Sequence, residues 1–501
     1  MAITFLSRSR AQTAIALLMV LLGQGCTEPM VRFDSLEHDQ AACLAWYRKL
    51  DTLLDEHELV GRSAAKIPGF PYLRADRFLA SFRLQPLNES AYMDWLERMQ
   101  QLDRSLRLKE IANLPPADAK AVLAEAPMPD SVGEVLQQCG SRLVQAALQR
   151  PETRPFLRQH VRAPDIYQSW QRIIGAYWLM QYPANLMLER LHEKLAASFA
   201  QPLDQLPVHG RLIRYALPSG GVMTSAEIKG MLRAAYQNPM AIPTLSEENL
   251  ERLFDHFAPV WEIDTRNDSD KIGAVYLAEQ GRPRVDIRHP VVYRKHAYTR
   301  WQGRILLQLI YQIWLPAREK TGLIDVYGGD LDSMIWRVTL SPEGVPIGYD
   351  SIHACGCYHL LFPGPGYRSI SPRDDAADVL SPKHIGSIQP GQRLLLRIEA
   401  RTHHLQQTAV INESDRIPAT LYQIKPYESL LSLPLPDGSN HSLFGQDGLI
   451  AASARLERFL LWPYGVPSAG AMREWGIQAI ALTGKRYFDE PFLLENLMAS
   501  E

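Results

Sequence analysis

The spacing of apolar residues changes near Ala258 and Pro259, and this change constrains the fold more than any other feature of the chain. Before it, apolar residues recur at intervals of three and four, which is typical of amphipathic helices. After it, short runs of strand-forming residues alternate with turn residues. We therefore expect an α+β protein with a largely helical N-terminal half and a mixed half that contains an antiparallel sheet.

The N-terminal half, residues 27–257, predicts a series of helices. Asn88 can cap a helix that runs to about Asn113, where a double proline stops it, and Ser131 can begin another that runs to about Gln149. Further helical spacing is found at residues 39–54, 165–181 and 184–199. The segment 67–72, Ile-Pro-Gly-Phe-Pro-Tyr, contains two prolines, and we expect it to be a rigid loop across the helices.

The mixed half, residues 258–447, is expected to be rich in strands. Residues 301–315 are apolar on nearly every side, which predicts a buried helix that packs against the sheet. Residues 334–340 and 345–353 flank Ser-Pro-Glu-Gly, which favours a hairpin, and residues 393–401 form another expected strand. Residues 448–501 are expected to return to helix.

Residues 1–26 have the pattern of an export signal. Two arginines precede an apolar run at residues 14–22 that is too short to span a bilayer, and the run is followed by Leu-Gly-Gln-Gly-Cys26. This segment resembles the signal peptide and lipobox of bacterial lipoproteins. The resemblance implies that residues 1–25 are removed and that Cys26 carries acyl chains such as palmitate. It also implies an exported protein that is tethered to a membrane of the cell envelope and faces the periplasm. Ordinary secretion without a lipid is the alternative.

Composition narrows the classes of partner. Apolar residues make up 46% and charged residues 22% of the chain, as in ordinary globular proteins. Removing residues 1–25 removes two arginines and no acidic residue, so the formal charge changes from −2 to −4 (−2 − 2). A negatively charged chain does not favour a nucleic-acid partner. Protein partners are left open.

Export would place the cysteines in an oxidising compartment, where thiols tend to pair. With Cys26 lipidated, four cysteines remain, and the simplest pairing joins Cys43 to Cys139 and Cys355 to Cys357. Cys139 lies on an apolar helix face, so a buried free thiol is the alternative there.

The densest chemistry in the chain is His-Ala-Cys-Gly-Cys-Tyr-His, residues 353–359. Its four metal-ligating side chains are His353, Cys355, Cys357 and His359. In an extended strand these six steps would span about 20 Å, too far for one ion. A shared site therefore requires a turn, and Gly356 is where a turn costs least. A bridge between Cys355 and Cys357 would need the same turn.

Three interpretations of this motif remain open. It can bind zinc or another transition metal through a subset of its residues, completed by His403 or His404. It can be a thiol or disulfide pair without metal, or a purely structural turn. Asp332, Asp350 and Glu399 are weak candidates for acid–base catalysis, and a loop with Asn267, Asp268 and Asp270 is a weak candidate for calcium.

Several common motifs are missing from the sequence. It has no His-Glu-x-x-His, no Gly-x-Ser-x-Gly, no phosphate-binding loop, no dinucleotide fingerprint and no Cys-x-x-Cys-His for haem. The leading hypothesis is a cell-envelope lipoprotein with a Cys/His metal site, and the activity that it suggests is metal-dependent hydrolysis. The alternatives are a non-enzymatic envelope protein with structural disulfides and a thiol–disulfide redox protein. The sequence does not decide whether the chain is an enzyme.

Overall fold

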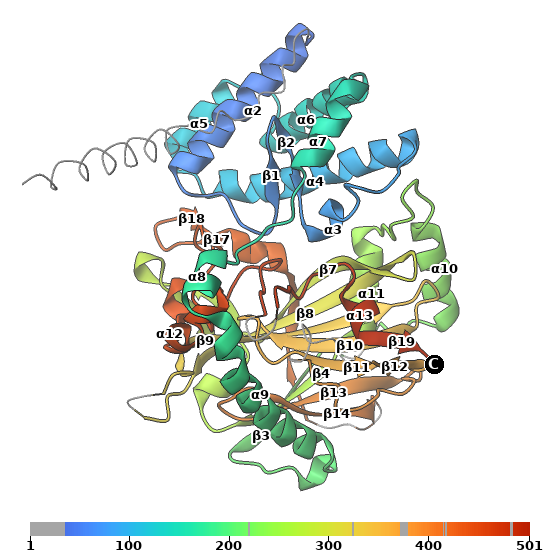
Figure 1. The fold of residues 1–501 in the computed structure, drawn as a ribbon, viewed down its shortest axis with the longest axis vertical. Helices are drawn as coiled ribbons and strands as arrows, with labels where there is room; N and C mark the ends of the chain where they lie inside the picture. Colours follow the sequence, from blue (N-terminus) through green and yellow to red (C-terminus); the bar gives the residue numbers. More distant parts are fainter. Residues whose placement is uncertain are drawn as a thin grey trace, which may run out of the picture.

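A computed structural model describes residues 36–218, 221–322, 325–370, 379–413, 415, 418–480 and 484–501. It shows an α+β protein in which a helical N-terminal part lies above two β-sheets (Figure 1). The export segment and Cys26 lie outside the described residues. Within the described residues, no helix is both long enough and apolar enough to cross a membrane.

The N-terminal part has its own hydrophobic core, formed between helices α2, α4 and α6 and a small hairpin. The predicted cap at Asn88 is confirmed, because its side chain accepts a hydrogen bond from the backbone N–H of Ala91 at 2.9 Å. Ser131 caps α6 in the same way. The expected loop at 67–72 was wrong: these residues belong to a hairpin whose turn contains Gly69 with φ +82°. The elements are α2 His38–Glu56, β1 Ala65–Ile67, β2 Phe70–Ala75, α3 Arg77–Ala80, α4 Glu89–Ala112, α5 Pro116–Ala124, α6 Val132–Leu148 and α7 Arg154–His160.

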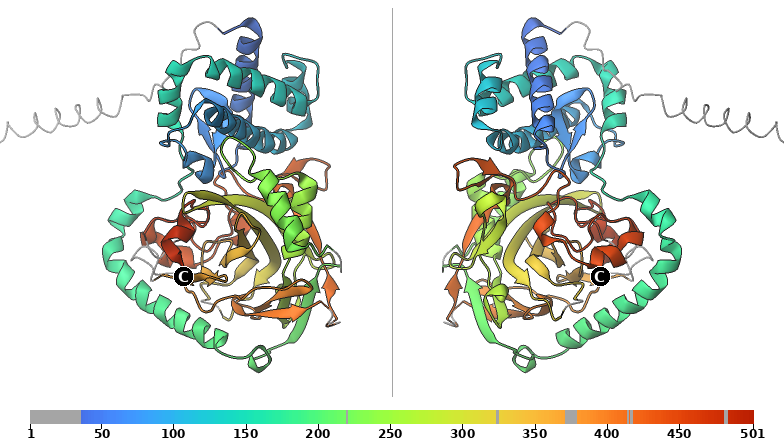
Figure 2. Two further views of the ribbon diagram at one scale, coloured as in Figure 1. Left: turned by 90° about the vertical axis from the view of Figure 1, so that its right-hand side faces the viewer. Right: turned by 90° about the vertical axis from the view of Figure 1, so that its left-hand side faces the viewer.

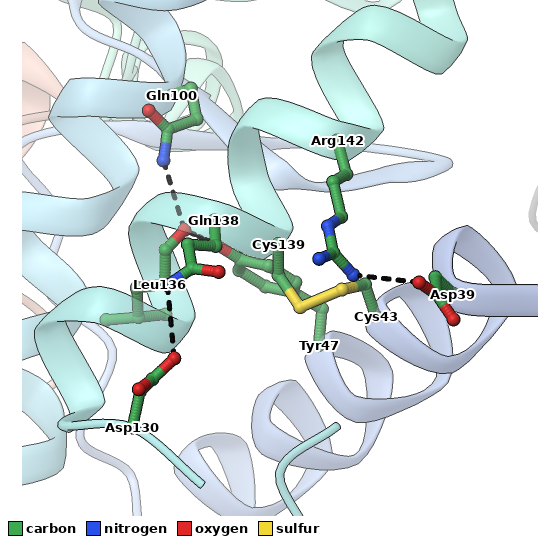
Figure 3. The surroundings of a disulfide bond; sticks show 9 residues. All are labelled: Asp39, Cys43, Tyr47, Gln100, Asp130, Leu136, Gln138, Cys139 and Arg142. Atoms are coloured by element: carbon green, nitrogen blue, oxygen red, sulfur yellow. Dashed lines mark hydrogen bonds and ion pairs between the residues drawn. A yellow bond between two sulfur atoms is a disulfide. The ribbon is translucent and has the colours of Figure 1, made fainter. Parts of the chain in front are cut away.

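A disulfide between Cys43 of α2 and Cys139 of α6 joins two helices of this core, as the sequence predicted (Figure 3). Tyr47, one turn further along α2, donates a hydrogen bond to the carbonyl of Leu136 at 3.1 Å. The covalent and polar links therefore fix the same pair of helices.

Two helices, α8 Ser169–Ile174 and α9 Tyr177–Phe199, connect the upper part to the sheets. They run down the outer side of the sheet region (Figure 2). The chain then enters β3 Arg211–Ala216 and two helices, α10 Ser225–Ala235 and α11 Glu247–Phe257. The sheet region therefore begins before residue 258, where the sequence placed its start.

The larger sheet has six strands in the order β11-β10-β9-β8-β7-β16, antiparallel except at the β7–β16 edge. Its strands are β7 Val291–Trp301, β8 Arg304–Arg318, β9 Gly329–Leu340, β10 Pro346–His353, β11 Leu360–Pro363 and β16 Gln423–Pro426. The predicted hairpin is the β9–β10 pair, and Gly344 in its turn has φ +82°.

The second sheet has five strands in the order β14-β13-β4-β3-β15, and one core fills the space between it and the larger sheet. Its remaining strands are β4 Val260–Thr265, β13 Gln392–Ile398, β14 Leu405–Asn412 and β15 Thr420–Leu421. Smaller pairs are β5 Ala274–Leu277 with β6 Pro283–Asp286, β12 Tyr367–Ser369 with β19 Met498–Ser500, and β17 Leu433–Pro434 with β18 Asn440–His441.

The expected buried helix at 301–315 is strand β8, at the centre of the larger sheet. Leu307, Leu309 and Tyr311 face the core between the sheets, whereas Leu306 and Ile310 face a second core on the other side. A strand buried on both faces has no polar alternation, so its sequence resembles that of a buried helix.

The C-terminal segment is also not helical in the way the sequence predicted. From residue 448 onward its described helices are short: α12 Glu457–Leu460, α13 Leu493–Leu497 and two single turns. Apart from these helices and strand β19, the segment is irregular chain. It covers the outer face of the larger sheet, and Met472, Phe488 and Leu494 are buried against that face. The apolar residues of this segment are buried because the irregular chain packs on the sheet, so their presence does not indicate a helix.

Candidate functional site

The chain turns at Gly356, as predicted, so the four ligands of the motif do not lie along one extended strand. Gly356 has φ +95°, and its N–H donates a hydrogen bond to the carbonyl of His353 at 2.8 Å. The carbonyl of Cys357 accepts a hydrogen bond from the N–H of His353 at 2.9 Å. A Cβ at position 356 would lie 2.3 Å from the carbonyl oxygen of Ala479, so only glycine fits this turn.

One histidine of the motif joins a buried cluster with His403, which lies in the loop between β13 and β14. His403 hydrogen-bonds with Asp332 on β9 at 2.7 Å and with Asp270 at 3.1 Å, one carboxylate at each ring nitrogen. The Nδ1 atom of His353 lies 3.6 Å from the other oxygen of Asp332, and its Nε2 atom lies 3.1 Å from the carbonyl oxygen of His403. Two histidines and two carboxylates are thus in mutual contact.

Charge balance holds this cluster together. Burial lowers the pKa of His403, but the hydrogen bonds with Asp270 and Asp332 outweigh burial and raise the pKa above its ordinary value. Burial raises the pKa of Asp332, but its bonds with both histidines bring the pKa well below its ordinary value. His403 is therefore a buried cation between two carboxylates, and Asp332 is a stabilised anion rather than a free catalytic base.

The other histidine of the motif, His359, belongs to a different cluster. Its Nε2 atom lies 3.3 Å from Asp350, whose carboxylate also forms a bidentate pair with Arg337, with one contact at 2.8 Å. Burial lowers the pKa of His359 despite this carboxylate. Asp350 is thus committed to a buried ion pair, and His353 and His359 do not share a partner.

Cys355 and Cys357 are free thiols in the structure, so the simplest predicted pairing holds for Cys43 and Cys139 only. A hydrogen bond with Cys355, together with burial, raises the pKa of Cys357 well above its ordinary value. A protonated thiol is a weak nucleophile and a weak metal ligand until it loses its proton.

A cavity of about 420 Å³ lies between α9 and the motif. Its walls are mostly apolar and come from α9, the β10–β11 connection and the C-terminal segment. The apolar lining includes Met180, Met187, Leu191, Leu195, Leu460 and Ile480, and the polar lining includes Arg318, Tyr327, Cys357, Tyr358, His404 and Glu457. Such a combination of apolar walls and a few polar groups is typical of small-molecule sites.

His404 is the one polar residue of this lining for which both ring nitrogens lack a hydrogen-bond partner among the described residues. Its exposed fraction is 6%, and the nearest carboxylate oxygen, from Glu399, is 3.9 Å away. Burial, together with nearby His353 and Arg318, lowers the pKa of His404 well below its ordinary value. A buried neutral imidazole without hydrogen-bond partners lowers the stability of the protein unless a ligand or water bonds to it.

Glu399, the third candidate for acid–base catalysis, is at the edge of this arrangement. It accepts a hydrogen bond from the hydroxyl of Thr402 and lies 3.5 Å from Lys194 of α9. These contacts link α9 to the loop that carries His403 and His404. Glu399 is therefore well placed to position the loop.

Two cavity residues were missed by the sequence analysis. Arg318, at the end of β8, donates a hydrogen bond to the hydroxyl of Tyr358 at 3.4 Å but forms no ion pair with a described carboxylate. Burial raises the pKa of Glu457 to about 7. Neither residue belongs to a motif, because tertiary structure alone brings β8 and the C-terminal segment to the cavity. The apolar sequence of α9 was the available signal, since a helix apolar on its outer face indicates a partner.

Three residues around the cavity and the histidine cluster have a strained backbone conformation. Leu331, Tyr358 and His403 all have positive φ, at 55°, 63° and 55°. Non-glycine residues in this region cost roughly 1–3 kcal/mol each, and such residues cluster at functional sites. The strain directs attention to the same residues as the unpartnered His404.

The calcium candidate loop separates into two parts. Asp270 enters the cluster described above, whereas Asp268 pairs with Lys271 at the surface and Asn267 caps its own turn. Within the described residues, no group of three or more His, Cys, Asp or Glu side chains has an arrangement that could hold a metal ion. No family model, no curated protein and no solved structure matches this chain.

Proposed function

We propose that this protein is a cell-envelope lipoprotein that binds an amphiphilic molecule with an anionic head group in the cavity beneath α9. The observation that carries the proposal is His404, a buried imidazole with two unpartnered nitrogens beside an otherwise apolar cavity. A ligand that supplies a hydrogen-bond partner here would remove the cost of those nitrogens.

The apolar part of the ligand would lie along α9. Leu191, Leu195 and Leu460 contribute aliphatic surface to the cavity, and each buried CH₂ of a ligand chain contributes about 0.8 kcal/mol. A cavity of about 420 Å³ accommodates a single acyl chain or a molecule of similar bulk.

The polar part of the ligand would lie near Arg318. This guanidinium has five N–H donors, and among the described residues its one hydrogen bond to a side chain, to Tyr358, is long at 3.4 Å. A carboxylate or a phosphate would accept charge-assisted hydrogen bonds from the remaining N–H donors of Arg318. His404 and Tyr358 are within the same lining and would supply further polar contacts.

Equilibrium binding of fluorescent amphiphiles tests this proposal. A C16 fatty acid and a C16 lysophosphatidic acid, each with a fluorophore on the chain, distinguish carboxylate from phosphate, and a C16 alcohol lacks the charge. We expect Arg318→Gln to weaken binding of the anions about 10- to 100-fold, as for loss of a charged hydrogen bond. Arg288→Gln, at an exposed arginine, is the matched control. If neither anion binds, or if the alcohol binds as tightly as the anions, the proposed head-group site is wrong.

Metal-dependent hydrolysis is a second proposal, based on the contacts that link His353, His403, Asp332 and Asp270. As these side chains lie, they do not form a metal-binding arrangement, so an ion would have to reorient them. These are ligand types that zinc accepts, and a metal ion there would replace the protons that His403 shares with its carboxylates. Metal content per mole of protein, measured for the full chain and for His403→Ala, tests it. A metal that persists in His403→Ala, or no metal in protein prepared with added zinc, would contradict this assignment.

The thiol-redox and non-enzymatic alternatives are separated by the reactivity of Cys355 and Cys357. The raised pKa of Cys357 predicts slow alkylation by iodoacetamide in the native state. Rapid alkylation or a reversible Cys355–Cys357 disulfide would favour the redox proposal. Mass spectrometry of the N-terminal peptide tests the lipid anchor at Cys26, because an unmodified cysteine indicates ordinary secretion.

A further inference from the structure

The segment 166–188 has an unusual charge distribution. Its 23 residues contain one charged side chain, Arg172, and no acidic residue, although Asp165 and Glu189 flank it directly. The segment includes all of α8 and the first half of α9. The exposed face of this segment therefore carries almost no charge.

The outward side chains of these two helices form an exposed apolar surface, here called the α8–α9 patch. It consists of Trp170, Ile173, Ile174, Trp178, Leu179 and Tyr182. The exposed fractions are high, for example 78% for Ile173 and 63% for Trp178. Large apolar side chains that are exposed together, on consecutive helices, indicate an interaction surface rather than scattered exceptions.

The second half of α9 has the ordinary pattern of a docked helix. Leu195 and Phe199 are buried, Lys194 pairs with Glu399, and Ser198 donates a hydrogen bond to the carbonyl of Gln406 at 3.1 Å. In the first half, the carbonyl of Met180 accepts a hydrogen bond from Tyr464 at 2.8 Å. Helices α8 and α9 lie on the outer side of the molecule (Figure 2), and these contacts hold α9 in place, so the exposed side chains of the patch form a fixed surface.

We propose that the α8–α9 patch lies on the surface of a lipid bilayer and that the cavity exchanges its amphiphile with that bilayer. This inference rests on the proposed function and deepens it. The patch combines tryptophan and tyrosine with isoleucine and leucine, which is the composition of protein surfaces at the membrane–water interface. A lipid at Cys26 would keep the chain at a bilayer.

Continuity between the patch and the cavity supports a bilayer as the source of the ligand. Met180, Met187 and Leu460 line the cavity and are also exposed, and Met180 directly follows Leu179 of the patch on α9. An amphiphile could pass from the bilayer along α9 with its chain in apolar surroundings throughout. Transfer through water would expose that chain, at about 0.8 kcal/mol for each CH₂.

Tryptophan quenching by brominated lipids tests the contact directly. Of the ten tryptophans, Trp170 and Trp178 are the two that are more than half exposed. The acylated full chain on phosphatidylethanolamine–phosphatidylglycerol vesicles with brominated acyl chains should show quenching. We expect Trp170→Phe with Trp178→Phe to remove most of it, and Ile173→Glu with Leu179→Glu to reduce it at least twofold. Leu84→Glu, at a residue that is 81% exposed on another part of the molecule, should leave it unchanged.

Two results would overturn the proposal. One is quenching of the vesicle-bound protein that is no greater than that of the Trp170→Phe/Trp178→Phe variant. The other is a concentration-dependent dimer in sedimentation that Ile173→Glu with Leu179→Glu abolishes while quenching stays absent, which would assign the patch to a second copy of the chain.

A separate measurement distinguishes this proposal from the proposed binding site. Without vesicles, Ile173→Glu with Leu179→Glu should leave the Kd for the C16 fatty acid within about twofold of wild type, because the cavity is intact. Uptake of the same probe from donor vesicles should slow at least fivefold. Arg318→Gln should have the reverse effect, with weaker binding and unchanged lipid quenching. If the probe does not bind but quenching occurs, the cavity proposal fails and the membrane surface stands.

Discussion

The Cys43–Cys139 disulfide should stabilise the N-terminal helices by restricting the unfolded chain. It joins positions 96 residues apart, and in the chain-entropy model a loop of about 100 residues removes roughly 4.7 kcal/mol of unfolded-state entropy at 25 °C. Part of that gain is offset when the unfolded chain retains structure. We therefore expect the double substitution Cys43→Ala with Cys139→Ala to lower the free energy of unfolding of this part by about 3–5 kcal/mol.

Hydrogen exchange of the α2 and α6 amides measures this loss locally, without requiring the whole chain to unfold in one step. Reduction of the wild-type protein should produce the same increase in exchange, whereas Cys355→Ala should not, because Cys355 forms no disulfide. The hydrogen bond from Tyr47 to the carbonyl of Leu136 stays in both cases (Figure 3). Equal protection in oxidised, reduced and substituted protein would refute the reasoning. So would alkylation of Cys43 and Cys139 in unreduced native protein.

Three further substitutions test the surroundings of the cavity by urea unfolding. Asp350→Asn should cost about 3–5 kcal/mol, because it leaves the buried guanidinium of Arg337 without its carboxylate; a loss below 1 kcal/mol would contradict a structural role. Burial raises the pKa of Glu457 from 4.5 to about 7, so its stability contribution is present below about pH 4.5 and is lost as pH rises through 7. Glu457→Gln should therefore stabilise the protein at pH 8.5, on the order of 3 kcal/mol, and have little effect at pH 4.5; an equal effect at both would refute the shift. Gly356→Ala should destabilise the protein more than Gly303→Ala. Both glycines have positive φ, but only a Cβ at position 356 would also clash with the carbonyl of Ala479. Equal losses of stability would show that the contact with Ala479 relaxes freely.

Local sequence signals predicted local structure well and long-range burial poorly. Asn88 and Ser131 mark helix starts because their side chains bond to backbone N–H groups within the next turn, which needs no tertiary information. Gly356 was identifiable for a similar reason, since a change of direction between two apolar runs favours glycine. Strand β8 was mistaken for a helix because both of its faces are covered by elements that lie far away in the sequence.

The α+β class followed from the change in periodicity, but the sequence did not indicate which elements form the cavity. Helix α9 was recognisable as a helix, yet its role as the wall of a cavity depends on contacts with Glu399 and Tyr464, more than 200 residues later. The same is true of Arg318 and Glu457, which carry no motif. A side chain acquires a shifted pKa or an unmet hydrogen bond only from its three-dimensional surroundings.

His403 and His404 show most clearly where sequence reasoning stops. The two residues are adjacent, and both were proposed as metal ligands on equal grounds. In the structure, the positive φ of His403 turns its ring toward Asp332 and Asp270, where it is held as a cation. His404 lines the cavity instead, where it is neutral and without a partner. Substitution should separate them: His403→Ala removes the cation that balances two buried carboxylates and should cost about 3–5 kcal/mol of stability. His404→Phe should leave stability within about 1 kcal/mol of wild type or raise it, because it removes two unmet polar atoms, yet weaken amphiphile binding. If the two variants lose stability equally, His404 is part of the structural cluster, and the cavity loses the residue on which its proposed function depends.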